Sequence, residues 1–443
     1  MPEDGRDRRD VRQSQGLQES EGLQALRETR ATREVPEARR RAWAGVGLLL
    51  VLALTAVLLG GGRDTGDRGQ AAARCAPHTV AGWSAADRLT AEFARYGDDP
   101  ARTDDWTGGD GTHSLRLPDG RLLWLFSDTY LGPVHAPPNP AGESHPWRDA
   151  TAPLVRNSAV VMTAGGRLTA TLPAPLFPDP APRQWRWPVA ARVEPRSPGA
   201  AERVVRVVLW TRAAGQAPWI YGVPLATEVA TLSLPDLRVE SIVRVRDERA
   251  VADPSRRVLF GTTLVTEDGW SYVFGGDDGQ AAARPVSSAF VARVPEGSLA
   301  DPAAWEYWTG SGWAAGARPA AVLGDEWRTG VGSAFSVVRR GGTYVLFTMA
   351  AGTRGLTDVT SYWACSPTGP WHGPARVLTA PLPPGEVAAY NPQAHPELGG
   401  GDGRLVLSYD VNWLPTTDAS AQLSGNAGLY RPRFVTLRLR ADR

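Results

Sequence analysis

From about residue 104 onward, the chain alternates short apolar runs with polar turns and shows no long helical periodicity. Such runs, bounded by Gly, Asp and Pro, are typical of β-strands. Similar turns recur, each directly before a compact apolar run: Asp119-Gly120 before 122–126, Asp268-Gly269 before 270–274, Gly341-Gly342 before 344–347, and Asp402-Gly403 before 405–409. A weaker turn at Pro198-Gly199, before 204–210, fills the double-length gap after the first turn. The pattern therefore predicts five similar units.

Each unit also carries a later apolar run that predicts an outer strand, at 158–162, 230–234, 288–293, 361–366 and 434–439. Several antiparallel strands repeated at a period of about 60 to 80 residues favour sheets arranged around an axis. We therefore predict an all-β fold, a five-bladed β-propeller over residues 104–443. A β-sandwich is the alternative, but it does not require the fivefold spacing.

Residues 42–62 carry no charge and consist mostly of Leu, Val, Ala and Gly. At about 1.5 Å of rise per residue, a helix of this length matches a hydrocarbon core of about 30 Å. Residues 39–41 are all Arg, which predicts that they stay in the cytoplasm. We expect a single transmembrane helix that places residues 1–41 inside, as a disordered tail, and the rest outside the cell. A cleaved signal peptide is the alternative, with the alanines at 71–73 as its cleavage site.

Residues 63–103 are predicted to form a polar linker and a short helix, capped by Ser84 and running to about Arg95. The two cysteines, Cys75 and Cys365, both fall on the predicted outer side, where a disulfide persists. One such bond would join the start of the domain to a late blade, and two buried free thiols are the alternative. The sequence has no CxxC motif and no ligand cluster for zinc.

The amino-acid composition limits the classes of binding partner more than it limits the possible folds. The net charge of +1 indicates neither a nucleic-acid partner nor an acidic one. All 48 basic residues are Arg, which indicates a GC-rich genome such as that of an actinobacterium. The 17 Trp residues are more numerous than either the 10 Tyr or the 9 Phe residues, and Trp is well suited to stacking on the apolar face of a sugar.

Four short segments of the sequence resemble a known group of proteins. Gly109-Asp110-Gly111, the turn at 117–121 and the run 123–129 resemble the first blade of five-bladed propeller glycosidases. They are most similar to an actinobacterial branch, long described as domains of unknown function, that includes endo-D-arabinanases. The segment 391–396 resembles the last blade of the same group. Over about residues 100–440, the resemblance implies a glycoside hydrolase acting on a furanose-containing, arabinan-type polysaccharide of the cell envelope.

Asp110 and Asp128 are the leading catalytic pair. If 118–120 is a three-residue loop with Gly120 in the left-handed conformation, Leu117 pairs with Arg121 and Asp110 falls opposite Asp128. Neighbouring carboxylates cannot both ionise easily, so one would stay protonated, as glycosidic cleavage requires. The resemblance likewise implies that aspartates at these two positions are catalytic. A two-residue loop or a bulge would place them on opposite faces, and Asp128 would then be a turn or cap residue.

Glu326 and Arg328 precede the predicted inner strand of the fourth blade. Glu326 is a candidate general acid, because the better-known arabinanase and xylosidase propellers use a Glu from a middle or late blade. Arg328 would orient a carboxylate or sugar hydroxyls. An ordinary surface loop with a salt bridge is the alternative.

Most of the remaining candidates lie near the predicted starts of inner strands, which are unusually polar or aromatic, whereas Asn157 precedes the predicted outer strand 158–162. The predicted substrate-binding residues are Asn157, Trp187, Arg328, Tyr390, Asn391, Gln393 and His395. Trp187 is either a stacking platform or core packing, and His395 binds sugar hydroxyls, contacts a buried ion or is structural. Asp277 and Asp278 are either Ca²⁺ ligands or a plain turn, and no other cofactor is expected.

The sequence lacks the GxSxG, HExxH and phosphate-loop motifs, which disfavours serine hydrolases, zinc proteases and nucleotide enzymes. Three functions remain. The first is a membrane-anchored glycoside hydrolase that acts on a cell-envelope polysaccharide. The second is a non-catalytic carbohydrate-binding propeller, and the third is a surface scaffold for another protein.

Overall fold

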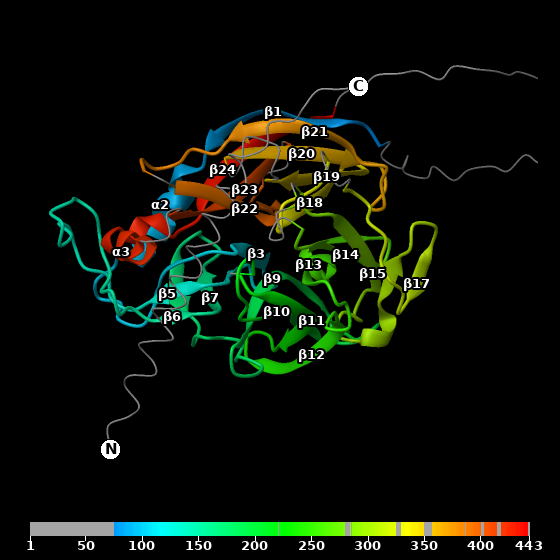
Figure 1. The fold of residues 1–443 in the computed structure, drawn as a ribbon, viewed down its shortest axis with the longest axis horizontal. Coiled ribbons are helices and arrows are strands. Elements are labelled where there is room, and N and C mark those ends of the chain that lie inside the picture. Colours follow the sequence, from blue (N-terminus) through cyan, green and yellow to red (C-terminus); the bar gives the residue numbers. More distant parts are fainter. Residues whose placement is uncertain are drawn as a thin grey trace, which may run out of the picture.

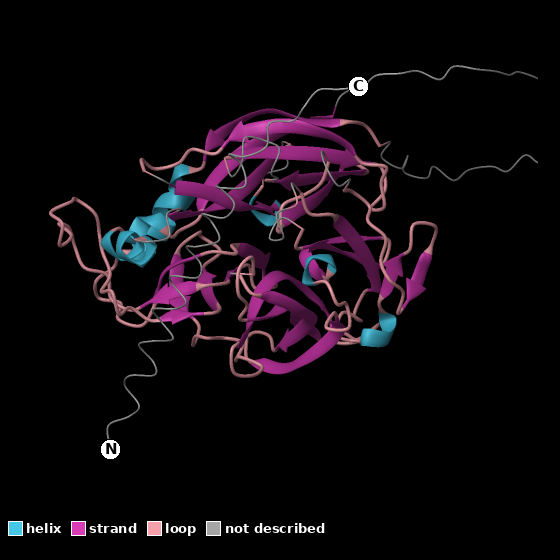
Figure 2. Ribbon diagram, viewed as in Figure 1, coloured by secondary structure: helices cyan, strands magenta, loops and turns pink. Residues whose placement is uncertain are grey.

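The structure, a computed structural model, describes residues 75–219, 221–279, 284, 286–324, 329–349, 357–385, 387–399, 403–413 and 418–441. Strands dominate this part of the chain, and its two α-helices are short: α2 (Asp87–Gly97) and α3 (Ala419–Gly425) (Figure 2). Neither described helix is long and apolar enough to cross a membrane. The predicted tail 1–41, the predicted span 42–62 and the site candidates Glu326 and Arg328 lie outside the described residues.

Five antiparallel sheets, numbered here in chain order, make up most of the fold. Sheet 1 contains β3 (His113–Arg116), β4 (Leu122–Phe126), β7 (Ser158–Met162) and β8 (Leu168–Thr171). Sheet 2 contains β9 (Gln184–Pro195), β10 (Arg203–Ala213), β11 (Val223–Leu232) and β12 (Val239–Asp247). Sheet 3 contains β13 (Val258–Glu267), β14 (Trp270–Asp277), β15 (Ala289–Pro295), β16 (Glu306–Trp308) and β17 (Trp313–Ala315).

The last two sheets close the series. Sheet 4 contains β18 (Phe335–Arg340), β19 (Thr343–Thr348), β20 (Asp358–Ala364) and β21 (His372–Thr379). Sheet 5 contains β22 (Val387–His395), β23 (Arg404–Trp413), β24 (Arg433–Ala441) and, outermost, β1 (His78–Ala85). A smaller extension sheet of β2 (Trp106–Gly109), β5 (Thr129–Leu131) and β6 (Leu154–Val155) lengthens the first hairpin.

The sheets are arranged around a centre. The first strands β3, β9, β13, β18 and β22 contact one another in this order, and β22 contacts β3 again (Figure 1). Each hydrophobic cluster joins two neighbouring sheets: Leu125 of sheet 1 packs with Val207 of sheet 2, for example, and Val345 of sheet 4 packs with Leu407 of sheet 5. The fold is therefore β-rich and propeller-like, with its core divided among the spaces between sheets.

The predicted turns join the first and second strands of the five sheets. At their glycines the backbone has positive φ, for instance +87° at Gly120 and +77° at Gly269, which a residue without a Cβ adopts at little cost. The predicted outer strands correspond to the third strands β7, β11, β15, β20 and β24. These first turns are short, whereas the connections from second to third strands are longer and lie at the opposite end of the sheets.

At the N-terminal end of the described residues, the observed strand and helix differ from the predicted linker and helix cap. Ser84 does not cap a helix, because it lies in β1 and pairs with Thr436 of β24. Helix α2 begins after Ala86, and no side chain caps its N-terminus. Residues 78–85, expected in a linker, instead supply the outer strand of sheet 5, where backbone pairing along β24 outweighs the local capping signal.

The predicted disulfide is confirmed. Cys75 and Cys365 are bonded, with 5.5 Å between their Cα atoms and 290 residues between them in sequence. Cys365 directly follows β20 of sheet 4, and Cys75 lies just before β1 of sheet 5. Backbone bonds beside the disulfide add to this link, since the amide of Ala76 donates to the Thr343 hydroxyl at 3.1 Å.

We expect the Cys75→Ser/Cys365→Ser variant to lose about 2–5 kcal/mol of unfolding free energy, because the cross-link restricts a long loop of the unfolded chain. Thermal unfolding with and without a reductant checks this result. The reductant should lower the melting temperature of the wild type and leave that of the variant unchanged. An equal effect on both proteins would contradict the expectation.

Candidate functional site

The hairpin that carries Asp110 and Asp128 has the predicted register. The amide of Leu117 donates to the carbonyl of Arg121 at 2.8 Å, so 118–120 is the three-residue loop. Gly109 pairs with Thr129 on one side of the aspartates, and His113 pairs with Leu125 on the other. Between these pairs, the amide of Asp110 donates to the carbonyl of Asp128 at 3.1 Å. The amide of Ser127 donates to the carbonyl of Asp110 at 2.7 Å, so the pairing is irregular here and Asp110 lies against both Ser127 and Asp128. The two aspartates are therefore neighbours, and the predicted register holds on either side of them.

Both aspartates lie at the end of the ring where first strands begin and second strands end, which we call the mouth. Asp110 directly follows β2 and precedes β3, and Asp128 follows β4. The same end holds the start of β9 with Trp187 and the start of β22 with Tyr390. Three neighbouring sheets thus contribute polar or aromatic side chains to one place.

Asp128 is buried and accepts a hydrogen bond on each carboxylate oxygen. Nη1 of Arg156 donates to one oxygen at 2.9 Å, and Nε1 of Trp187 donates to the other at 2.8 Å. Arg156 follows β6 of the extension sheet, and Trp187 lies in β9 of sheet 2. This carboxylate is therefore fixed in orientation by two donors from different sheets.

Asp110 has a different environment. It is partly exposed, and the hydroxyl of Tyr390 donates to its Oδ2 at 2.9 Å, with Tyr430 as a second hydrogen-bond partner. Burial of the carboxyl, together with the charges of Asp128 and Asp410, raises the pKa of Asp110 well above its ordinary value. Although the residue keeps some exposed surface, its carboxyl group is enclosed by protein, and its position beside two other carboxyls favours the protonated form.

Asp410 is a third carboxylate that the sequence analysis missed. It lies on β23, is 1% exposed, and accepts from the amide of Gly111 and the hydroxyl of Thr112, both at 2.7 Å. The side-chain amide of Asn391 also donates to it, at 3.3 Å. Burial raises the pKa of Asp410 to about 6, against these hydrogen bonds. Asp410 therefore holds the backbone directly after Asp110.

A signal for Asp410 was present in the repeat. Asp128 follows the second strand of sheet 1, Asp277 ends the second strand of sheet 3, and Asp410 lies near the end of the second strand of sheet 5. An alignment of the five units at their turns would have placed these three aspartates at the same end of the ring. The strand prediction stopped at Tyr409, one residue short of this position.

Among the predicted substrate-binding residues, Trp187, Tyr390 and Asn391 lie beside the carboxylates. Asn391 has a positive φ of +49°, and its backbone lies at an irregularity in the pairing of β22 with β23. Burial and the charges of Asp110 and Asp410 raise the pKa of Tyr390, so its hydroxyl stays a donor. These residues hold the carboxylates in place.

Asn157 and His395 have structural positions instead. Asn157 is 0% exposed, and its amide group makes three hydrogen bonds to the backbone of Phe177 and Arg186. His395 is also completely buried, between the hydroxyls of Ser114 and Ser408, and burial lowers its pKa to about 3. Neither side chain faces solvent, so the geometry does not support contact with a sugar.

Gln393 is buried on the first strand of sheet 5, and its Nε2 makes no hydrogen bond within the described residues. Asp277 and Asp278 interact with protein donors. Asp277 accepts from the amide of Ser288 and pairs with Arg284, while Asp278 pairs with Arg212. Across the described ranges, no cluster of three or more His, Cys, Asp or Glu side chains is suited to hold a metal ion. The geometry at Asp277 and Asp278 fits a structural turn.

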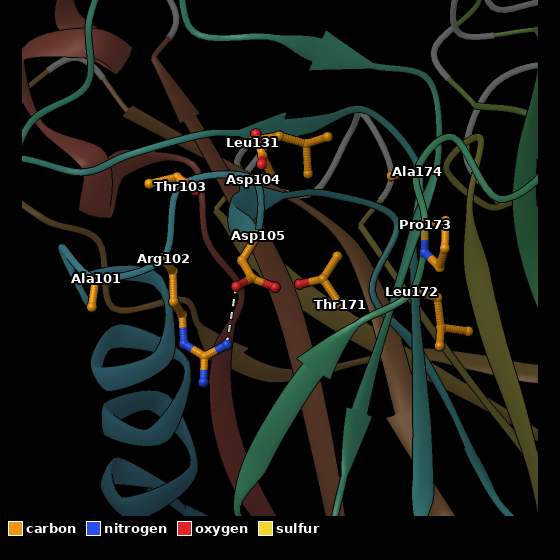
Figure 3. Close-up of a pocket in the computed structure, with 10 residues that line it drawn as sticks. All are labelled: Ala101, Arg102, Thr103, Asp104, Asp105, Leu131, Thr171, Leu172, Pro173 and Ala174. Carbon is orange, nitrogen blue, oxygen red and sulfur yellow. Dashed lines mark hydrogen bonds and ion pairs between the residues drawn. The ribbon is translucent and has the colours of Figure 1, made fainter.

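A cavity of about 620 Å³ lies apart from the carboxylates (Figure 3). Residues 101–105, Leu131 and 171–174 line it, and none of these was a predicted site residue. Figure 3 shows Asp105 with its carboxylate toward Thr171 and paired with Arg102, at 3.0 Å. The cavity borders the outer end of the extension sheet, whereas Asp110 and Asp128 lie at its inner end.

The protein is thus a β-rich, propeller-like protein with a group of three carboxylates at one end of its ring. Residues 92–439 match the family described as a domain of unknown function, DUF5005, and the chain belongs to this family. Comparison with curated protein sequences finds no match.

Solved structures share the fold at low identity. A putative hydrolase from Bacteroides ovatus is 18% identical with a TM-score of 0.58, over 80% of this chain and 89% of that one. An α-L-arabinofuranosidase from Podospora anserina is 12% identical, with a TM-score of 0.43 over 76% of this chain and 91% of its own. A levansucrase of B. subtilis is 12% identical, with a TM-score of 0.42 over 77% and 84%. The first of these similarities supports the fold alone.

We expect the Asp410 carboxyl to titrate with a midpoint of about 6, because burial disfavours its ionised form. Carbon-detected NMR of labelled aspartates measures this directly. The exposed Asp247 serves as the control, since its partner Arg249 lowers its pKa to about 2. Titration of Asp410 below pH 4 would contradict the buried environment described here.

Proposed function

We propose that this protein hydrolyses glycosidic bonds at its mouth, with Asp110 as general acid and Asp128 as the second carboxylate. One observation carries the proposal: Asp110 has a raised pKa directly beside Asp128, whose two oxygens both accept hydrogen bonds. Cleavage of a glycosidic bond requires one carboxyl that donates a proton and one that acts as nucleophile or base.

The reaction divides between the two residues. The Asp110 proton goes to the leaving oxygen as the bond to the anomeric carbon breaks, and Asp110 becomes a carboxylate. Asp128 either attacks the anomeric carbon or removes a proton from an attacking water. The donors Arg156 and Trp187 orient Asp128 toward this task, and Tyr390 orients Asp110. Asp410 places the Gly111 backbone and adds a charge that keeps Asp110 protonated.

The wider proposal concerns architecture and location. We infer that the five sheets are blades of a five-bladed propeller and that residues 42–62 anchor the chain in the membrane, with residues 75–443 outside the cell. The substrate we propose is a furanose-containing, arabinan-type polysaccharide of the cell envelope. The motif resemblance at 109–129 supports this substrate class, and the description of the Bacteroides ovatus protein as a hydrolase agrees with the reaction class.

A non-catalytic carbohydrate-binding protein is the second candidate. The observation in its favour is that Asp128 and Asp410 are both buried and both bonded to protein donors. Carboxylates whose hydrogen bonds are all made within the protein also suit a rigid binding site. The two functions differ in whether Asp110 is required for turnover or only for contact with the sugar.

The Asp110→Asn variant should lose about 10²–10⁴-fold in kcat, because an amide cannot supply the proton to the leaving group. Oligosaccharide release from cell-envelope polysaccharides by the full-length protein measures this, and calorimetry measures retained binding. Asp119→Asn, in the exposed turn of the same hairpin, is the matched control and should keep full activity. Binding without any turnover by the wild type would favour the non-catalytic alternative, and neither binding nor turnover would overturn both.

The Asp410→Asn variant tests the electrostatic part of the mechanism. Asp110 must be protonated, so activity is present below its pKa and falls as pH rises through that value. Removal of the Asp410 charge lowers the pKa of Asp110, which should move the alkaline limb of the kcat/KM profile to lower pH. Asp247→Asn, at an exposed position elsewhere, should leave the limb unchanged. A limb that stays in place or moves to higher pH in Asp410→Asn would contradict this role.

A further inference from the structure

Three large apolar side chains stand out as exposed within the described part of the chain: Leu154 (41%), Trp83 (40%) and Tyr221 (36%). Exposed apolar side chains beside polar groups are typical of binding sites. Leu154 lies on β6 and pairs with Tyr130, two residues before the Arg156 that binds Asp128. Trp83 lies on β1, the outermost strand of sheet 5, which is the edge farthest from the ring centre.

Tyr221 lies in the connection between β10 and β11, which leaves sheet 2 at the mouth. The following residue, Gly222, has a positive φ of +84° and packs against Trp185 so closely that an added Cβ would lie 2.4 Å from the indole. The carbonyl of Gly222 accepts from Nη2 of Arg212 at 3.0 Å. The backbone beside Tyr221 is thus held by both packing and hydrogen bonding.

The side chains that hold this backbone also contact the partners of the carboxylates. The guanidinium of Arg212 lies 5.4 Å from the ring centre of Trp187, and the Trp187 indole donates to Asp128. Trp185, against which Gly222 packs, also lies under the guanidinium of Arg156 at 4.5 Å, and Arg156 is the second donor to Asp128. The backbone that carries Tyr221 therefore borders the side chains that bind Asp128, and Tyr221 itself is exposed.

We propose that Tyr221 is a stacking platform for a sugar unit next to the cleaved linkage, with Leu154 as a second apolar contact. An exposed aromatic side chain, on a backbone held beside the partners of Asp128, matches a sugar that presents C–H groups on one side and hydroxyls on the other. The ligand class is an oligosaccharide or polysaccharide that occupies at least two adjacent units, one at Asp110 and Asp128 and one on Tyr221. This inference rests on the proposed function for its substrate class.

The test compares Tyr221→Ala with Tyr221→Phe in the full-length protein. Loss of the ring should raise KM for polysaccharide about tenfold, with kcat changed far less, because stacking acts on binding. Tyr221→Phe keeps the ring and should restore the wild-type KM. Leu154→Ala should raise KM by a smaller factor, and Trp83→Ala, an equally exposed aromatic at the outer edge, should leave both constants unchanged.

Binding alone is measured by calorimetry with the polysaccharide, in an Asp110→Asn background if the wild type is catalytic and in the wild-type background if it is not. A tenfold loss of affinity in the Tyr221→Ala form supports the stacking site even if the protein is a non-catalytic binder. An unchanged KM and affinity, or a fall in kcat alone, would overturn the stacking role while leaving the hydrolase proposal intact. If the wild type neither binds nor cleaves any polysaccharide offered, the proposed function fails, and the stacking site fails with it.

Discussion

The pairing of β1 with β24 is the interaction on which the arrangement depends. It brings the first described strand beside the last one, so that sheet 5 combines residues from near both ends of the described part of the chain. Figure 1 shows the two strands side by side, blue beside red. The bond between Cys75 and Cys365 then ties this outer strand to sheet 4. These two links hold the first and last parts of the ring together, and so keep the five first strands facing one another.

Convergence of the first strands has an electrostatic consequence. It gathers Asp110, Asp128 and Asp410 from sheets 1 and 5 in one place, where like charges disfavour full ionisation. The structure offsets this cost by giving each carboxylate different partners: a guanidinium and an indole for Asp128, backbone and hydroxyl donors for Asp410, and tyrosine hydroxyls for Asp110. Burial beside like charges raises the pKa of Asp110, which is the basis of its proposed role as general acid.

The sequence was informative where local chemistry determines geometry. Gly120 specifies a three-residue turn, and the register counted from this turn brings Asp110 beside Asp128. It was uninformative where the outcome depends on distant segments. The local pattern at Ser84 indicates a helix cap, yet pairing with Thr436, far along the chain, draws this residue into a strand. Asp410 was missed because its importance comes from Gly111 and Thr112 of another sheet. His395 and Asn157 are polar as well, but their hydrogen bonds go to serine hydroxyls and to backbone groups and not to the group of carboxylates. Glu326 and Arg328 stay predictions.

The two ends of the sheets differ in a way that bears on how such proteins diverge. At one end, tight glycine turns join first strands to second strands and leave little room for insertions. At the other end, the longer connections carry Tyr221, Arg156 and helix α3 around the carboxylates. Changes in length or composition there alter what surrounds the aspartates without disturbing strand pairing. The surroundings of the aspartates can therefore change while the residues that determine strand pairing stay constant.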